Sequence, residues 1–305
     1  MTISIISHPD CLLHEMGENH PESPARLSAI QAQLMSSGLG MWVQHHDAPL
    51  ASREQLCGAH DAEYVDSIFD AAPTEGQVWL DPDTSMNPHS LPAALRAAGA
   101  VALGVDLVMT GESDTAFCNV RPPGHHAEHN RAMGFCIFNN VAVGVAHALK
   151  VYQLKRVAIV DFDVHHGNGT EDVFRDSPEV LFCSTFQHPF YPHAGAGDKP
   201  EHIINVPLSA GSDGEAFRAA VTSYFLPKLE AFEPQLIFFS AGFDVHVEDA
   251  MANLCLVEED YAWVTAAVKR IADKYAKGRM VSTLEGGYAL SALGRSVVAH
   301  VNAML

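Results

Sequence analysis

The chain is short of basic residues, with 18 lysines and arginines against 37 aspartates and glutamates and a formal net charge of −19. Nucleic-acid phosphates need basic patches, so this balance argues against a nucleic-acid partner. Two explanations of the acidity stay open. It serves solubility, as in proteins of salt-tolerant organisms, or it attracts cationic substrates to the mouth of a site.

Long apolar runs and clustered cysteines are also missing. No apolar stretch approaches the ~20 residues of a membrane span, so no membrane partner is expected. Segment 1–10 has no basic leader and is predicted to be a first strand instead of a signal peptide, which favours a cytoplasmic location. The six cysteines contain no close pair, which favours reduced, packed thiols over disulfides or a cysteine zinc site.

What remains is the composition of an α/β protein. Hydrophobic residues make up 48% of the 305 residues, enough for a well-buried core in one large domain or two small ones. Short β-branched segments alternate with longer segments rich in alanine and leucine, a pattern typical of a mostly parallel sheet covered by helices on both faces. Ser23 is the predicted N-cap and Pro24 the predicted first residue of a helix that Gly38 ends. The other predicted helices are 90–111 and 258–277, and the predicted strands are 1–6, 115–119, 157–162, 180–184, 236–240 and 280–284.

Four polar clusters follow four of these strands, at the carboxyl ends where parallel sheets bind ligands. In one cluster, strand alternation should place Asp161, Asp163 and His165 on one side. Two carboxylates and an imidazole so placed are costly to keep without a cation, which predicts a metal site. Catalytic zinc takes three such ligands and leaves one position for water, so we expect Asp163, His165 and Asp244 to bind it. The four clusters span 121–126, 161–169, 240–244 and 285–288.

A two-metal site is the competing design, as in an arginase-like ureohydrolase with two manganese ions. Such a site needs further bridging carboxylates. The positions two beyond His165 and two beyond Asp244 are Gly167 and His246, so the second ion lacks its expected carboxylates. A mononuclear site is therefore preferred.

The residues beside the expected metal suit amide hydrolysis. His125 and His126 follow a proline-stiffened turn, and imidazoles can take a proton from water and return one to a leaving amine. A buried carboxylate such as Asp161 is a natural partner for the second nitrogen of such a ring. Tyr288, on a glycine turn, can donate a hydrogen bond to the oxyanion that forms when water attacks a carbonyl.

Together these segments resemble the zinc-dependent histone deacetylase family, in its class II-like bacterial deacetylase and acetylpolyamine amidohydrolase branch. The matching motifs, in the family's order, are Arg-Pro-Pro-Gly-His-His, Gly-Phe-Cys, Asp-x-Asp-Val-His-His-Gly-Asn-Gly-Thr, Ser-Ala-Gly-Phe-Asp and Glu-Gly-Gly-Tyr. A His-Pro-Glu-Ser-Pro-Ala-Arg-Leu segment near the N-terminus is similar to that branch. The resemblance covers essentially the whole chain. It implies one catalytic domain over residues 1–305, with the three-layer α/β/α arginase–deacetylase fold and zinc on the three ligands named above.

The resemblance also implies the catalytic roles. His126 would be the general base and then the acid, and His125 its electrostatic and hydrogen-bonding partner. Asp161 would orient His125, and Asn168 would orient His126. Tyr288 would polarise the amide carbonyl together with the zinc.

A substrate tunnel and potassium sites follow from the same resemblance. Phe135 and Tyr191 match the two aromatic residues that sandwich the stem of acetyl-lysine, although the family usually has phenylalanine in place of Tyr191. Arg26 and Cys136 match the lining of an inner pocket that holds the acetyl methyl group and releases acetate, and Asp83 is the candidate rim carboxylate. The remaining substrate-binding positions are Gly134, Met251, Gly286 and Gly287. One or two structural potassium ions would lie at an inner site formed by Asp161, Asp163, His165, Ser184 and Thr185 and an outer site formed by Phe174, Ser177 and Val180.

The substrate is expected to be an acylated-lysine peptide or protein, with an acetylated small amine as the alternative. One polyamine branch carries a glutamate seven positions after the third zinc ligand, and Met251 occupies that position here, as an apolar residue does in lysine deacetylases. The net charge suits either cationic substrate. A function from another class, a non-catalytic metal-dependent binder of acyl-lysine, is disfavoured by the intact histidine pair and Tyr288. The oligomeric state stays open.

Overall fold

A central sheet organises the computed structural model, which describes residues 2–39 and 42–305. Within these residues, eight strands form one sheet in the order β2-β1-β5-β10-β9-β6-β7-β8, and every neighbouring pair is parallel. The predicted parallel sheet is thus confirmed. Its four middle strands are buried throughout: β5 (Thr115–Cys118), β10 (Met280–Leu284), β9 (Leu236–Ala241) and β6 (Val157–Asp161).

The outer strands were harder to predict. β1 (Ile3–Ser7) and β7 (Val180–Gln187) were expected, and Met1 of the predicted first strand lies outside the described residues. The prediction missed the two edge strands, β2 (Val43–Asp47) and β8 (Ile203–Leu208), because neither has a continuous apolar run. β2 carries exposed polar side chains, and the apolar residues of β8 are interrupted by Asn205 and Pro207. It also missed a separate antiparallel pair, β3 (Val78–Asp81) and β4 (Thr84–Met86).

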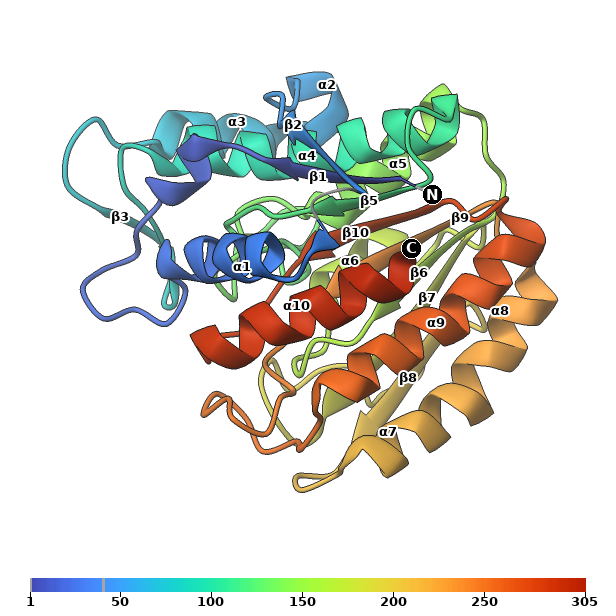
Figure 1. The fold of residues 1–305 in the computed structure, drawn as a ribbon. Coiled ribbons are helices and arrows are strands. Elements are labelled where there is room, and N and C mark those ends of the chain that lie inside the picture. The colour runs from blue at the N-terminus through green and yellow to red at the C-terminus, as the bar shows by residue number, and fades with distance from the viewer. Residues whose placement is uncertain (1, 40–41) are drawn as a thin grey trace.

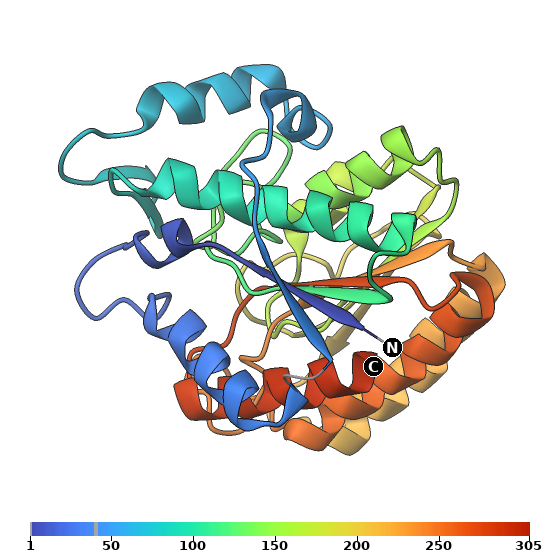
Figure 2. The same cartoon turned by 45° about the horizontal axis from the view of Figure 1, so that its top comes forward.

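Helices cover both faces of the sheet and make three layers (Figure 1). On one face α1 (Ala25–Ser36) packs against α10 (Leu290–Met304), which packs against α9 (Glu258–Tyr275). On the other face α4 (Ser90–Thr110) packs against α5 (Asn140–Val151), and Figure 2 shows the two groups on opposite sides of the strands. The shorter elements are η1 (Pro9–Leu12), α2 (Arg53–Leu56), α3 (Ala62–Ala71), α6 (Asn168–Phe174), α7 (Gly214–Ala220), η3 (Val221–Phe225) and α8 (Leu226–Phe232).

The helix ends agree with the sequence signals to within two residues. Gly111 follows α4 in the left-handed conformation that glycine adopts without a steric penalty. The predicted capping role of Ser23 is wrong: Pro24 itself holds the N-cap position of α1, and no side chain caps that end. A proline there needs no hydrogen-bond partner for its missing N–H.

Helix α4 corrects one expectation from composition. It is 21 residues long, as predicted, but it is also apolar enough to cross a membrane by length and hydropathy, whereas no apolar stretch of that length was expected. Of its most apolar window, 72% is buried within the protein, where the helix contacts β5 and α5. Its apolar character therefore has a structural explanation as the central helix of one covering layer.

His300, on α10, is a fully buried imidazole outside the four polar clusters. Its Nδ1 lies 2.6 Å from Thr265 Oγ1 and its Nε2 lies 2.9 Å from Ser282 Oγ, among aromatic rings that include Phe239. Burial lowers the pKa of His300 to about 3. The unfolded chain binds a proton near pH 6.5, whereas the folded chain does not until about pH 3. Stability from this group is therefore present above pH 6.5 and is lost as the pH falls toward 3.

We accordingly expect the free energy of unfolding to fall between pH 7 and pH 5, with His300 contributing up to about 1.4 kcal/mol per pH unit. The substitution His300→Gln should remove that contribution. Denaturant unfolding of both proteins at several pH values measures the difference. An identical pH dependence in the variant would show that His300 does not have this role.

Candidate active site

The four polar clusters converge because their strands are neighbours. β5, β10, β9 and β6 lie side by side in the middle of the sheet, all parallel, so their carboxyl ends share one edge. Ser240 at the end of β9 is in register with both Asp161 and Thr283. Residues from four distant parts of the chain thereby meet at the position where parallel sheets bind ligands.

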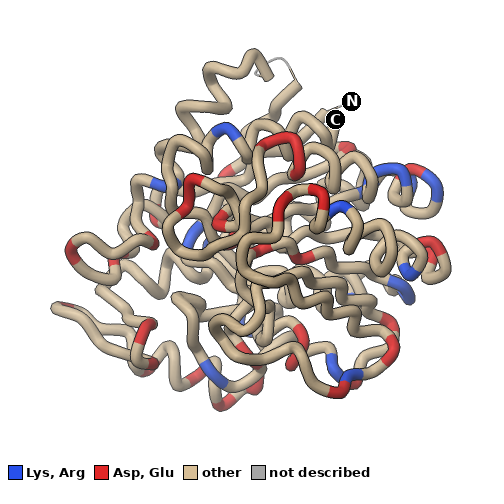
Figure 3. Tube along the Cα trace, turned by 90° about the horizontal axis from the view of Figure 1, so that it is seen from below, with Lys and Arg blue, Asp and Glu red and all other residues tan. Residues whose placement is uncertain are grey.

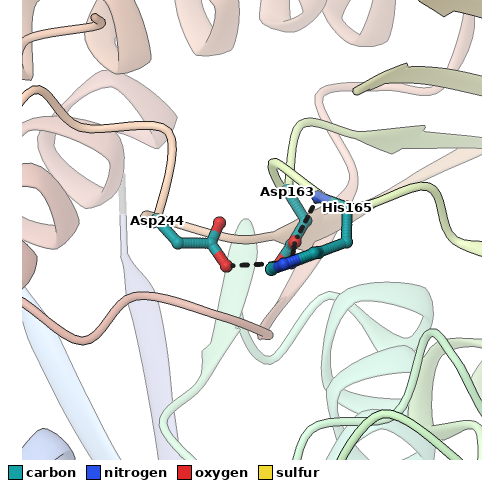
Figure 4. Close-up of side chains that lie close together, drawn as sticks. All are labelled: Asp163, His165 and Asp244. Atoms are coloured by element: carbon teal, nitrogen blue, oxygen red, sulfur yellow. Dashed lines mark hydrogen bonds and ion pairs between the residues drawn. The ribbon is translucent and has the colours of Figure 1, made fainter. Parts of the chain in front are cut away.

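The three predicted metal ligands come together in this place (Figure 4). His165 Nδ1 lies 2.9 Å from Asp163 Oδ1 and 3.3 Å from Asp244 Oδ2, and one ligand atom from each residue lies within 4.8 Å of the others. All three side chains are buried. Asp244 Oδ2 accepts no well-formed hydrogen bond, which is costly for a buried carboxylate oxygen, and its near contact is the ring nitrogen of His165, itself an expected ligand. One imidazole and two carboxylates with such an unpartnered atom fit a divalent metal ion.

The loop after β6, and not strand alternation, places two of these ligands. β6 ends at Asp161, before the position predicted from the sequence. The next turns are shaped by side-chain bonds: the Asp163 N–H donates to Asp161 Oδ1 at 3.1 Å, and the His165 N–H donates to Asp163 Oδ1 at 2.9 Å. Alternate residues still face one site, but the carboxylates themselves hold them there.

Glycines let the chain approach these carboxylates closely. A β-carbon added at Gly242 would collide with the Asp163 carboxylate, and one at Gly286 would collide with the Asp244 carboxylate. The Gly286 N–H donates to Asp163 Oδ2 at 2.8 Å. Backbone from β9 and β10 therefore packs directly on the ligand set, as only glycine allows.

The histidine pair lies next to the ligands with both rings oriented by hydrogen bonds. His125 Nδ1 lies 2.9 Å from Asp161 Oδ2, and His126 Nδ1 lies 2.7 Å from Asn168 Oδ1. The ring centroids are 4.1 Å apart. Tyr288 lines the same cavity as the two histidines. The structure thus brings together all five residues to which the sequence assigned catalytic roles: His125, His126, Asp161, Asn168 and Tyr288.

The pKa values of the two imidazoles are shifted in opposite directions. Burial lowers the pKa of His125, but the carboxylates of Asp163 and Asp161 outweigh it and raise the pKa to about 10. In His126 burial is reinforced by the positive charges of His125 and His165, and the pKa falls well below its usual value. Two adjacent groups with oppositely shifted pKa values are typical of acid–base sites.

Glu285 is a site residue that the sequence analysis did not assign. Its Oε2 accepts hydrogen bonds from the backbone N–H groups of Gly124 at 2.7 Å and His125 at 3.1 Å, and Ser240 Oγ donates to its Oε1 at 3.2 Å. Burial raises the pKa of Glu285 to about 7. Its position in the Glu-Gly-Gly-Tyr motif was the available signal, but only the fold shows that it fastens the histidine loop to two strands.

A cavity of about 200 Å³ leads to these groups. Phe190 stacks on the His165 ring at a centroid distance of 5.5 Å, and Tyr191 meets the His126 ring edge-on at 5.3 Å. Phe190 and Pro123 line the cavity although the sequence analysis did not name them. Six predicted substrate-binding residues also line it: Asp83, Gly134, Phe135, Tyr191, Met251 and Gly286.

The other three predicted substrate-binding residues, Arg26, Cys136 and Gly287, are not among its lining. Arg26 is fully buried: its Nε donates to Gly287 O at 2.7 Å, its Nη2 donates to Glu285 O, and its guanidinium carbon lies 5.0 Å from the centre of the Tyr288 ring. A third bond, from Nη1 to Glu22 Oε1 at 3.1 Å, anchors the guanidinium, so Arg26 supports the tyrosine turn and does not line this cavity. Cys136 is likewise buried, with its thiol directed at Gly134 O.

The positions matched to potassium ligands lie around β6 and β7. Asp161 and Ser184 are paired across these strands, and Ser184 Oγ is buried without a hydrogen-bond partner. Thr185 follows in the same buried strand. The three outer positions lie on or after α6, where the Ser177 N–H donates to Phe174 O and the Val180 N–H donates to Ser177 O.

Comparisons with known proteins agree with this geometry. Residues 20–304 match the model of the histone deacetylase domain. The chain belongs to the histone deacetylase family. It is 38% identical over 277 residues to a histone deacetylase-like amidohydrolase of Pseudomonas aeruginosa, covering 88% of this chain and 73% of that protein. It is also 38% identical to the uncharacterized protein slr0245 of Synechocystis, over 99% of each chain.

The fold of the chain also matches that of a solved structure. The crystal structure of the HDA15 HD domain superposes with a TM-score of 0.94 at 33% identity, covering 99% of this chain and 88% of that one. The three layers are therefore the arginase–deacetylase fold, as the sequence predicted. The chain is a hydrolase of the histone deacetylase family, whose substrates are acetylated.

Proposed function

We propose that this member of the histone deacetylase family is a zinc-dependent amidohydrolase that removes acetyl or related acyl groups from lysine side chains of a peptide or protein. One observation carries the proposal. One cavity is lined by Asp163 and His165 of the metal-binding Asp163–His165–Asp244 set, by the histidine pair and by Tyr288. We further propose that residues 1–305 form one catalytic domain.

The donor set defines where zinc would be held. Asp163, His165 and Asp244 supply one nitrogen and two carboxylate oxygens, with the unpartnered Asp244 Oδ2 among them. When bound, zinc polarises a substrate carbonyl and makes water a stronger nucleophile near neutral pH. The remaining chemistry belongs to residues of the chain.

The hydrogen bonds around His126 define which of its nitrogens is free. Asn168 Nδ2 donates to Glu128 Oε1 at 2.8 Å, which turns Asn168 Oδ1 toward His126 Nδ1. An amide oxygen only accepts, so Nδ1 carries the proton and Nε2 keeps its lone pair. Nε2 is therefore the atom that takes a proton from the attacking water and returns it to the leaving amine.

Tyr288 and the aromatic walls complete the site. Burial raises the pKa of Tyr288 well above its usual value, so the phenol stays protonated and donates to the carbonyl oxygen as negative charge develops there. Phe135 and Tyr191 line the cavity, where their rings can hold the aliphatic stem of acyl-lysine and exclude water. We also propose potassium at the inner site, supported by the unpartnered hydroxyl of Ser184 beside Asp161.

A fluorogenic acetyl-lysine amide tests the proposal. The protein loaded with one zinc per chain should release acetate from this substrate, and a hydroxamate, which binds zinc through two oxygens, should block turnover. Removal of zinc by a chelator should abolish turnover, and added zinc should restore it. Absence of turnover with stoichiometric zinc, across several acyl chain lengths, would contradict the proposal and favour a non-catalytic binder.

The same assay decides between lysine and polyamine substrates. Acetylpolyamine is the second candidate, because the chain is strongly acidic and Asp81 and Asp83 lie near the cavity. Figure 3 shows acidic residues around much of the trace, a distribution that also suits general solubility. Met251 lines the cavity and gives that wall an apolar surface, which favours the lysine substrate. We expect a higher kcat/KM for acetyl-lysine peptides than for acetylputrescine or acetylspermidine measured side by side.

A further inference from the structure

Asp249 makes three hydrogen bonds that connect two parts of the active-site cavity. Its Oδ2 accepts from the backbone N–H groups of Tyr288 at 2.6 Å and Ala289 at 2.9 Å. Its Oδ1 accepts from the N–H of Met251 at 3.0 Å. The side chain is buried, with the residue 5% exposed. Tyr288 and Met251 both line the cavity, so one carboxylate holds the backbone of two lining residues.

The bonds from Asp249 complete the restraint of the tyrosine turn. Arg26 binds the carbonyl oxygens of Glu285 and Gly287, and Asp163 binds the N–H of Gly286. Asp249 accepts from the N–H groups of Tyr288 and Ala289, at the end of the turn. Both kinds of backbone group in the turn are thus fastened by charged side chains from other segments, which restricts where the Tyr288 hydroxyl can lie.

Asp249 itself is placed by a closed loop after β9. The Val247 N–H donates to Leu256 O at 2.9 Å, and the Leu256 N–H donates to Val245 O at 3.1 Å, so the two ends of the loop are paired. The Asp249 N–H donates to His246 O at 2.8 Å. The carboxylate is therefore held by the same segment after β9 that contains the expected metal ligand Asp244.

A simple helix cap does not explain these contacts. A capping side chain accepts from the second or third N–H inside the helix. Helix α10 begins at Leu290, with Ala289 as its N-cap, and the N–H groups bound by Asp249 belong to Tyr288 and Ala289, before the helix begins. Its hydrogen bonds fix the turn before the helix, where the reactive phenol is attached.

We propose that Asp249 is a positioning residue for Tyr288: its carboxylate holds the phenol-bearing turn and the Met251 wall in one arrangement. This role rests on the proposed deacetylase function, in which Tyr288 donates to the developing oxyanion. A misplacement of about 1 Å can lower a rate about 10²-fold, so loss of this restraint should affect kcat more than zinc binding.

A double-mutant cycle tests the role. Asp249→Asn keeps the size of the side chain but replaces one acceptor oxygen with an NH₂ group. The amide therefore cannot accept from the Met251 N–H and from the N–H groups of Tyr288 and Ala289 at the same time. On the fluorogenic acetyl-lysine amide we expect kcat to fall about 10- to 100-fold, with KM and zinc content close to wild type. In the Tyr288→Phe background, which lacks the hydroxyl to be positioned, the same substitution should lower kcat less than about threefold.

Asp260→Asn is the matched control. Asp260 is also buried and also accepts a backbone N–H at a helix N-terminus, from Val257 at 2.9 Å, but it does not line the cavity. Its replacement should lower the unfolding temperature without changing kcat. If Asp249→Asn fails to fold, Asp249→Glu in both Tyr288 backgrounds replaces it, since it keeps both oxygens and the charge and should show a smaller kcat loss with the same dependence on the Tyr288 hydroxyl.

The outcomes separate the two proposals. An active wild type in which Asp249 and Tyr288 substitutions lower kcat independently, by factors that multiply, overturns the positioning role alone. An unchanged kcat in a folded Asp249→Asn protein overturns it as well. A zinc-loaded wild type without turnover overturns the proposed function, and with it this role.

Discussion

Replacing His126 with alanine should lower kcat by about 10²- to 10⁴-fold, the usual contribution of a general acid–base group. The reason is the free Nε2 lone pair: Asn168 holds Nδ1, and burial keeps the ring neutral at neutral pH. Zinc should remain bound, because His126 is not part of the Asp163–His165–Asp244 set. Steady-state turnover of the acetyl-lysine amide and metal analysis of the same preparation measure the two effects.

His129→Ala is the control for this substitution. His129 lies three residues further along, is half-exposed and binds Asp172 instead of the site residues. It should keep wild-type kcat. Comparable activity of the two variants would show that His126 does not act as the base. Loss of zinc from His126→Ala would instead show that His126 contributes to the metal-binding set.

Replacing Asp244 with asparagine should abolish stoichiometric zinc binding and lower kcat/KM at least about 10³-fold, because loss of the metal removes several kcal/mol of transition-state stabilisation. The amide oxygen can still accept the hydrogen bond that the Val164 N–H gives to Asp244 Oδ1 at 3.0 Å, so the loop should keep its shape. Metal content after dialysis and activity with added zinc measure the effect. Full zinc occupancy in the variant would place the metal elsewhere.

The same substitution should stabilise the metal-free protein. Burial, followed by the nearby Asp163 carboxylate, raises the pKa of Asp244 to about 6. A carboxyl whose folded pKa is raised contributes its stability below its unfolded pKa and loses it as the pH rises through the folded value, so ionised Asp244 destabilises the metal-free fold at pH 7. We expect Asp244→Asn to raise the free energy of unfolding of metal-free protein by about 1–3 kcal/mol at pH 7. An unchanged or lower value would contradict this electrostatic account.

The middle of the sheet was predictable and its edges were not. β10 occupies its predicted residues, and β9 and β6 differ from prediction by one residue at the end, because strands buried on both faces are continuous apolar runs. β2 and β8 have a neighbour on one side only and carry polar residues, so no local pattern distinguishes them from loops. The length of α4 was predicted correctly, but its apolar character was not recognised from composition.

The candidate site shows a similar division. Short motifs pointed to residues with chemically specific side chains, such as Asp163, His165 and Tyr288, and the structure brings them together. Residues that act through backbone N–H groups were missed. Glu285 and Asp249 bind amides 160 and 39 residues away, so no local spacing signals these partners. Phe190 was passed over beside Tyr191, since only the fold shows that both rings face the cavity.

The sequence by itself determined the layer architecture, the family resemblance and the residue types for metal-dependent amide hydrolysis, because apolar periodicity and ligand chemistry are local properties of the chain. The tertiary structure decided which wall residues line the cavity, that Arg26 supports the tyrosine turn behind it, and how Asp249 fastens Tyr288 to the Met251 loop. Those features depend on contacts between distant segments, whose geometry is fixed only when the strands pack side by side.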